Sequence, residues 1–291
     1  MRGPEGAPSN ILYMFQITFT AETSELDSIE EKLFALGASS VSISSFSKSK
    51  NSVTALADTA EQITEHFSDR NPEIHHIDET DWKDRWMDFY QGAAIDDEIF
   101  AGPDPDSPEA REAKYFIHLD PRDAFGDGRH PTTILCMREL RGALNRVNRT
   151  ELPDMRLIDA GTGSGIIAIL AEMLGIGTID GVELDPEACR RAEENLQRNN
   201  CRRITLHQGD IASFSSERKY HLVVANLLTD IILKHLSHLK NLMAPGGSLI
   251  ISGIGSQWDT QVRDALTNNS LTVKGFTEHE AWCCYRVQIS P

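Results

Sequence analysis

Hydrophobic residues in the first part of the chain follow two periods, that of strands and that of helices. Apolar side chains at every second position over residues 11–19 predict a strand with one face on a core. Apolar side chains at helical spacing over residues 26–36 then predict a helix, which Gly37 ends. Two strands, a short helix and a last strand follow at residues 39–46, 52–57, 59–67 and 73–77. The order β-α-β-β-α-β is the ferredoxin-like pattern, typical of a partner-binding or packing module without chemistry of its own.

From about Tyr115 onward, strands alternate with helices, as in a doubly wound α/β domain. Short apolar runs predict five parallel strands at residues 157–159, 178–183, 204–206, 221–225 and 248–252. Two helices fit between these strands, at residues 186–199 and 229–243. The first begins with a proline, which is suited to the first turn of a helix. Residues 271–275 and 282–289 are compatible with a terminal hairpin.

An aromatic helix is expected between these two parts. Trp82, Trp86 and Phe89 fall on one helical face, a pattern that favours packing between domains over direct ligand contact. Residues 101–108 form a polar, proline-rich loop. We therefore expect a ferredoxin-like α+β domain, a connecting helix with its linker, and a doubly wound, mostly parallel α/β domain, at residues 1–78, 79–100 and 101–291.

Composition and charge narrow the class of protein. The chain has 291 residues, 40% of them hydrophobic and 25% charged, which is typical of a globular protein with two domains. Its net charge of -16 argues against direct nucleic-acid binding, because phosphate binding needs clustered Lys and Arg, and suits a basic protein substrate better. The five cysteines form no C-x-x-C pair and have no histidine at zinc-ligand spacing, so we expect reduced thiols and no metal. Without a signal-peptide core or a long apolar run, we expect a cytoplasmic protein without membrane contact.

The strongest chemical signal is Asp159-Ala-Gly-Thr-Gly-Ser-Gly165, where an apolar strand passes into a glycine-rich turn and a helix. Gly161, Gly163 and Gly165 lack Cβ atoms, so this backbone can approach a ligand closely at a helix N-terminus. Dinucleotide sites usually need G-x-G-x-x-G spacing, and a carboxylate at Asp159 would repel the pyrophosphate of NAD. The same carboxylate can accept a hydrogen bond from a cationic ligand. The motif therefore favours S-adenosylmethionine over NAD.

Polar residues at the ends of three further strands fit the same cofactor, because ligands bind at the carboxyl edge of a parallel sheet. Glu183 can bind both ribose hydroxyls of an adenosine. NAD sites use an acid in the same way, so this residue alone does not distinguish the two cofactors. The alternative to a binding role is that Glu183 is a solvated strand end. Asp210 can accept from an adenine amino group, or it belongs to a plain turn. Asn226 follows the fourth strand, where its carboxamide oxygen can meet the methyl acceptor. An isolated asparagine after a strand is otherwise a turn former, and the candidate ligands at the other strand ends favour the functional role.

A second motif, Phe125-Gly-Asp-Gly-Arg-His-Pro-Thr-Thr133, predicts a loop that closes over a bound ligand before a helix. Thr133 is a candidate cofactor contact through its hydroxyl. For His130 we favour a role as helix cap over one as general base, because any helix entry needs polar groups.

These two motifs and Ala225-Asn-Leu-Leu228, in this order, resemble the ribosomal protein methyltransferase family that modifies large-subunit ribosomal protein eleven. The resemblance covers most of the chain. It implies a class I S-adenosylmethionine-dependent enzyme that methylates lysine side chains and the α-amine of its substrate, with a small N-terminal domain that recognises the substrate. Carried over by position, cofactor contacts fall on Thr133, Gly161, Glu183 and Asn226. The chain departs from the family at Glu183, usually Asp, and at Asp127 and Arg129, where the family's loop usually has threonines.

The chemistry expected of such an enzyme is mostly positioning, because methyl transfer to an amine needs alignment rather than a strong acid or nucleophile. Asn226 is the expected catalytic residue, since its side-chain oxygen can orient a neutral amine, and no residue stands out as a dedicated base. No Pro-Pro-aromatic sequence follows Asn226, which argues against enzymes that methylate planar amides or base amino groups. The alternatives are a class I methyltransferase for another protein or a small amine, and a non-catalytic ribosome-binding module. An NAD oxidoreductase is disfavoured.

Overall fold

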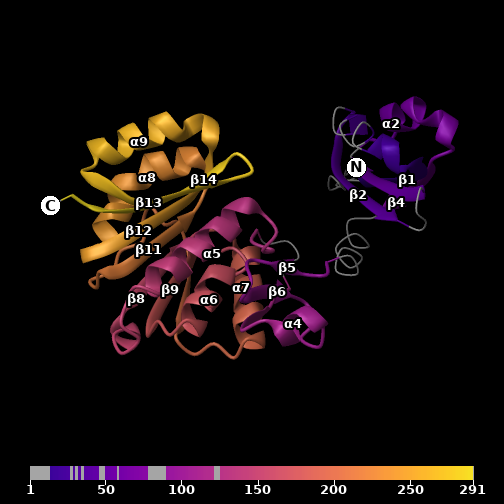
Figure 1. The fold of residues 1–291 in the computed structure, drawn as a ribbon. Coiled ribbons are helices and arrows are strands. Elements are labelled where there is room, and N and C mark those ends of the chain that lie inside the picture. Colours follow the sequence, from indigo (N-terminus) through magenta and orange to yellow (C-terminus); the bar gives the residue numbers. More distant parts are fainter. Residues whose placement is uncertain are drawn as a thin grey trace, which may run out of the picture. The chain divides into compact units, whose positions relative to one another are not determined.

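The computed structural model describes residues 14–26, 29, 32–33, 36–45, 50–57, 59–77, 90–120 and 125–290. The chain divides into two compact units, Met1–Asp88 and Phe89–Pro291 (Figure 1). The expected connecting helix at residues 81–89 lies outside the described residues, as do residues 11–13 and parts of the helix expected over residues 26–36. No helix in the described ranges has the length and apolar character needed to cross a membrane.

The first unit is built on one antiparallel sheet with the strand order β2-β3-β1-β4. Its strands and helices are β1 (Met14–Glu22), η1 (Thr23–Glu25), β2 (Ala38–Ser45), β3 (Lys50–Ala57), α2 (Glu61–His66), η2 (Ser68–Arg70) and β4 (Glu73–Ile77). Alternate residues of β1, such as Ile17 and Phe19, are buried, as the two-residue period predicts. Ile29 and Leu33, from the expected first helix, join this core. The unit has the ferredoxin-like arrangement expected from its sequence.

The second unit contains a seven-stranded sheet with the order β10-β9-β8-β11-β12-β14-β13. The strands are β8 (Arg156–Ala160), β9 (Thr178–Glu183), β10 (Ile204–Gln208), β11 (Tyr220–Asn226), β12 (Met243–Gly255), β13 (Leu271–His279) and β14 (Trp282–Ile289). The first five run parallel, and β14 inserts antiparallel between β12 and β13. The expected doubly wound, mostly parallel sheet and its terminal hairpin are both confirmed.

Helices cover both faces of this sheet (Figure 1). On one face lie α5 (Pro131–Leu144), α6 (Ile166–Met173) and α7 (Pro186–Arg198), and on the other α8 (Thr229–Leu242) and α9 (Asp259–Asn268), which follows η4 (Ser256–Trp258). The first seven residues of α6 are all buried, because this helix packs between the sheet and its neighbouring helices. The strand order reverses between β8 and β11, and this switch point is where ligands bind in such sheets.

A small three-stranded sheet precedes α5. It consists of β5 (Ala93–Ala94), β6 (Ile99–Gly102) and β7 (Tyr115–His118), and α4 (Pro108–Glu112) lies between β6 and β7 in the sequence. A further short helix, η3 (Leu152–Asp154), follows α5. The sequence predicts a connecting helix with its linker at residues 79–100 and a loop at residues 101–108. In the structure, β5 and the start of β6 fall in the first range, and the end of β6 and the first residue of α4 fall in the second. Ser107 accepts a hydrogen bond from Ala110 N and starts α4 within the proline-rich segment.

Candidate active site

The glycine-rich turn between β8 and α6 depends on residues without a Cβ atom. Gly161, Gly163 and Gly165 have φ angles of 75°, 53° and 85°, in the left-handed region that favours glycine. A Cβ on Gly161 would lie 2.4 Å from Leu227 Cδ2, and a Cβ on Gly163 would lie 2.4 Å from the backbone oxygen of Phe125. All three φ angles therefore favour glycine, and at Gly163 the close backbone contact leaves no room for a Cβ atom.

The turn is held by backbone hydrogen bonds on both sides. Gly161 N and Thr162 N donate to the carbonyl of Val182, at the end of β9, over 2.9 and 3.0 Å. Ser164 N donates to the carbonyl of Phe125 over 2.9 Å, and Ser164 Oγ donates to the carbonyl of Gly126 over 2.7 Å. These bonds join the two motifs singled out in the sequence, the glycine-rich turn and the loop at residues 125–130.

A cleft of about 430 Å³ opens beside this turn, at the switch point of the sheet. Its lining residues come from the ends of β8, β9, β10 and β11 or the turns that follow them, from the loop before α5 and the start of α5, from α8, and from β12 and β14. They are Phe125, His130, Thr132, Gly161, Gly163, Val182, Glu183, Leu184, Gly209, Asp210, Ile211, Asn226, Leu227, Leu228, Ile231, Gly253 and Trp282. Five of the eight predicted site residues line this cleft, namely Gly161, Gly163, Glu183, Asp210 and Asn226. The other three, Thr133, Asp159 and Gly165, lie behind its lining.

Asp159 lies beneath the glycine-rich turn and is fully buried. Its Oδ2 atom accepts a hydrogen bond from Thr162 Oγ1 over 2.7 Å, while Oδ1 has no hydrogen-bond partner among the described residues. Burial raises the pKa of this carboxyl to about 7; the hydrogen bond from Thr162 opposes the shift, and the charge of Glu183 adds to it. A buried carboxyl with one unsatisfied oxygen is suited to accept a donor from a ligand.

Asn226 ends β11 and lines the cleft. Its Nδ2 donates to Thr133 Oγ1 over 3.3 Å, and Oδ1 is buried without a partner in the described parts of the chain. Thr133 is fully buried in the first turn of α5. The threonine thereby orients the carboxamide and leaves its oxygen as the free acceptor.

Glu183 and Asp210 lie at the ends of neighbouring strands. Glu183 accepts hydrogen bonds from Gly163 N at 2.8 Å and from Asp185 N at 3.0 Å, so its carboxylate also supports the glycine-rich turn. Asp210 is exposed and accepts from Ala212 N at 2.8 Å. A carboxylate has about four lone-pair sites, so each residue retains capacity for a ligand hydroxyl or amine.

The loop before α5 forms an aromatic wall of the cleft. The ring of His130 contacts Phe125 and Trp282 edge-on, with centroid separations of 5.3 and 5.1 Å. His130 is the N-cap of α5 and accepts from Thr132 N, which confirms its expected role as a helix cap. Burial lowers the pKa of its imidazole. The adjacent ion pair of Arg129 with Asp127, at 2.6 Å, involves the two positions at which this loop departs from the resembled family.

Sequence reasoning missed two apolar contributors to the cleft. Trp282 was assigned only to a hairpin, and the antiparallel insertion of β14 is what brings it to the cleft. Leu184 is 66% exposed between Glu183 and Asp185, and an apolar side chain in this polar segment was a signal that could have been used. Gly165 supports the turn without lining the cleft, since a Cβ there would meet Leu196 at 3.0 Å.

No group of three or more potential metal-ligating side chains occurs within the described ranges. All five cysteines, which the structure does describe, are free thiols. Cys136, Cys283 and Cys284 are buried.

The sheet order, with one antiparallel strand inserted at the end, and the glycine-rich turn at the switch point define a class I methyltransferase fold. A solved structure of ribosomal protein L11 methylase from Lactobacillus delbrueckii subsp. bulgaricus shares this fold, with a TM-score of 0.62 and 27% sequence identity, over 69% of this chain and 100% of that chain.

The family model described as ribosomal protein L11 methyltransferase (PrmA) matches residues 9–289, and the chain belongs to this family. A ribosomal protein L11 methyltransferase of Desulforapulum autotrophicum is 34% identical over 210 residues, which cover 71% of this chain and 66% of that protein. Another of the same description, from Exiguobacterium sibiricum, is 35% identical, with coverage of 72% and 64%. The chain thus spans slightly less than two thirds of the length of these relatives.

Proposed function

We propose that the chain is an S-adenosylmethionine-dependent protein methyltransferase that modifies lysine side chains, and the α-amine, of ribosomal protein L11. The observation that carries the proposal is Asn226 Oδ1, an acceptor that has no partner among the described residues and belongs to a side chain that lines the cleft, beside a turn that has no room for a Cβ atom at Gly163. This acceptor suits an amine that carries donors. Membership of the family supports the same assignment.

The residues present fit S-adenosylmethionine, which when bound supplies a methyl group on a positively charged sulfur. Glu183 and Asp210, which line the cleft, are suited to its ribose hydroxyls and adenine amino group. The glycine-rich turn, with Asp159 buried beneath it, is suited to its charged end. Phe125, Leu184 and Leu228, exposed by 55, 66 and 65%, provide apolar surface at this cleft. Such surface is suited to cover an adenine ring or the methylenes of a lysine.

Asn226 is proposed to orient the acceptor. Its Oδ1 can accept a hydrogen bond from a neutral amine, and the bond from Nδ2 to Thr133 keeps that oxygen from rotating away. A lysine amine, with an ordinary pKa of about 10.4, must lose a proton before it can attack, and removal from water favours the neutral form. No cleft residue is assigned as base, so water is proposed to take the proton. Catalysis then rests on alignment.

The first unit is proposed to recognise the substrate, because the cleft is complete within residues 125–282. The net charge of -16 suits a partner that presents lysines. We also propose that the protein acts in the cytoplasm.

Calorimetry and substrate competition test the proposal in two steps. Titration with S-adenosylhomocysteine should give saturable binding, and titration with NAD should give none; the reverse result would exclude the cofactor assignment. With methyl-labelled S-adenosylmethionine, label should appear in L11 rather than in an equal amount of another lysine-rich ribosomal protein. Equal labelling of both proteins would contradict the proposed specificity for L11 and would indicate a methyltransferase of different specificity.

A further inference from the structure

Helix α7 presents a buried asparagine to the back of the glycine-rich turn. Asn195 is 0% exposed. A Cβ on Gly165 would lie 3.0 Å from Leu196 Cδ1 and 3.5 Å from Ala192 Cβ, so this face of α7 packs directly against the turn. A buried carboxamide costs free energy unless its donors and acceptors are paired. The partners of Asn195 therefore show what the side chain holds together.

Asn195 uses its full hydrogen-bonding capacity on groups around the site. Its Nδ2 donates to the carbonyl of Ser164 over 2.9 Å and to that of Asp120 over 3.2 Å. Its Oδ1 accepts from Asp120 N and from Arg198 Nη1, both at 3.0 Å. The Asn195 side chain thus joins Ser164, in the glycine-rich turn, to Asp120, in the segment that follows β7.

Ser164 extends this connection to the loop that lines the cleft. Its carbonyl is held by Asn195, while its Oγ and N–H bond the carbonyls of Gly126 and Phe125. Phe125 also contacts the turn through its backbone oxygen, where a Cβ on Gly163 would not fit. Asn195, Ser164 and the backbone of residues 125–126 therefore form one continuous hydrogen-bonded chain.

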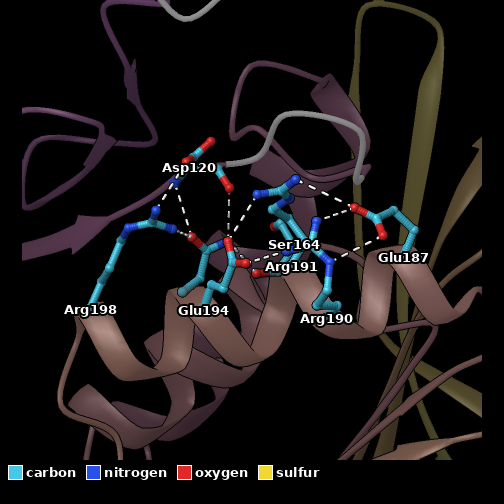
Figure 2. Close-up of polar contacts among 8 residues, drawn as sticks. Asp120, Ser164, Glu187, Arg190, Arg191, Glu194 and Arg198 are labelled. Atoms are coloured by element: carbon cyan, nitrogen blue, oxygen red, sulfur yellow. Dashed lines mark hydrogen bonds and ion pairs between the residues drawn. The ribbon is translucent and has the colours of Figure 1, made fainter. Parts of the chain in front are cut away.

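Charged side chains of α7 form ion pairs in this region (Figure 2). Arg198 pairs with Asp120 at 3.0 Å. Arg191, only 5% exposed, pairs with Glu194 at 2.9 Å and with Glu187 at 3.4 Å. The pairs of Arg191 lie within α7, whereas the pair of Arg198 with Asp120 joins this helix to the segment after β7, which the hydrogen bonds of Asn195 also hold.

We propose that Asn195 is a positioning residue that, through Ser164, holds the glycine-rich turn and the 125–126 backbone in the arrangement that binds S-adenosylmethionine. This inference rests on the proposed function. Asn195 does not line the cleft, so its effect falls on cofactor affinity and not on the alignment of the acceptor amine. Its loss raises the KM for S-adenosylmethionine and leaves kcat nearly unchanged.

The test compares Asn195→Ala and Asn195→Asp with Asn199→Ala. Aspartate has the same shape but lacks the donors to Ser164 and Asp120. Asn199, the C-cap of α7, bonds the backbone of His118 at 2.9 and 2.8 Å and the carbonyl of Asn195 at 2.8 Å. It makes no hydrogen bond to Ser164 and provides the control for loss of a polar side chain at this end of α7. We expect the Kd for S-adenosylhomocysteine to rise by about tenfold in both Asn195 variants and by less than about twofold in Asn199→Ala, the scale of one buried hydrogen-bonding group.

Amide hydrogen exchange of the ligand-free proteins gives a readout that does not depend on the cofactor. Exchange at Ser164 N should be faster in the Asn195 variants and unchanged in Asn199→Ala. Equal effects in all three, or wild-type exchange and affinity in Asn195→Asp, would overturn the inference. If Asn195→Ala does not fold, Asn195→Asp and Ser164→Ala carry the same expectation. If the wild type binds no cofactor, the proposed function fails, while the exchange at Ser164 still decides whether Asn195 holds the turn.

Discussion

Asp159 is a buried carboxyl whose protonation makes the stability of the protein depend on pH. Its pKa of about 7 in the folded protein lies above the ordinary 3.8, so between these pH values the native protein binds a proton that the unfolded chain releases. The free energy of unfolding of the ligand-free protein therefore receives a contribution from this group that decreases as the pH rises through this range.

We expect Asp159→Asn to lose this contribution, because asparagine does not titrate. Relative to wild type, the variant should become more stable as the pH rises from 3.8 to about 7, which urea unfolding at several pH values measures. At pH 8 it should also bind S-adenosylmethionine more weakly, since a negative acceptor is lost. A difference in stability between the two proteins that stays constant with pH would contradict the assignment.

The positions of single residues could be predicted only as far as the strands that carry them. Glu183 and Asn226 end strands of a parallel sheet, so their proximity to the turn follows from the pattern of elements. The hydrogen bond from Asn226 to Thr133 joins residues far apart in sequence, and no local period shows it. Asn195 gave no signal either, because a buried asparagine within a charged helix resembles a surface residue in sequence.

At the scale of elements, the turn between β8 and α6 depends on glycine for both its φ angles and its packing. We expect Gly163→Ala to lower the free energy of unfolding by roughly 1–2 kcal/mol from left-handed strain alone. Displacement of the Phe125 backbone, 2.4 Å from the new Cβ, should add to this loss and weaken S-adenosylhomocysteine binding by at least about tenfold.

Gly142 in α5 provides a control outside the cleft, because a Cβ there would meet nothing within 4 Å. Gly142→Ala should retain wild-type affinity and at least wild-type stability in the same calorimetric and unfolding experiments. If the two alanine variants behave alike, the close fit of the turn is not what the cofactor requires.

The start of α5 should respond to pH through its cap. The folded pKa of His130 is below its ordinary 6.5, because burial of the imidazole outweighs the charges of Asp127 and Glu280, which act to raise it. Its contribution to stability is thus present above pH 6.5 and is lost as the pH falls below that value toward the lowered pKa. His130→Asn keeps a capping oxygen without titrating, so its unfolding free energy should vary less over this range. An identical pH dependence in both proteins would exclude the effect.

At the scale of the whole molecule, the cleft lies entirely within the second unit. We therefore expect a fragment of residues 89–291 to bind S-adenosylhomocysteine within about threefold of the full chain, as a domain with its own core should. The same fragment should methylate L11 poorly, because the proposed recognition unit is missing. Full activity of the fragment would show that the first unit is not required for recognition.

The order of elements could be predicted for both units, whereas their sheets could not be completed from sequence. The strand and helix patterns found β4, β9 and the start of α7 at their observed residues. The small sheet of β5, β6 and β7 was missed, because its strands have two to four residues, too few to establish a period. The place of β14 inside the large sheet follows from tertiary packing, and Trp282 reaches the cleft for that reason.

The most direct measurement is intact-mass spectrometry of L11 after incubation with the full chain and S-adenosylmethionine, with Asn226→Ala and the exposed-site control Asn241→Ala in parallel. We predict mass increases in steps of one methyl group for wild type and Asn241→Ala, and a rate at least about 100-fold lower for Asn226→Ala, the scale expected when alignment is lost. Asn226→Ala should still bind S-adenosylhomocysteine. Unmodified L11 with the wild-type chain, under conditions in which the cofactor binds, would contradict the proposed substrate.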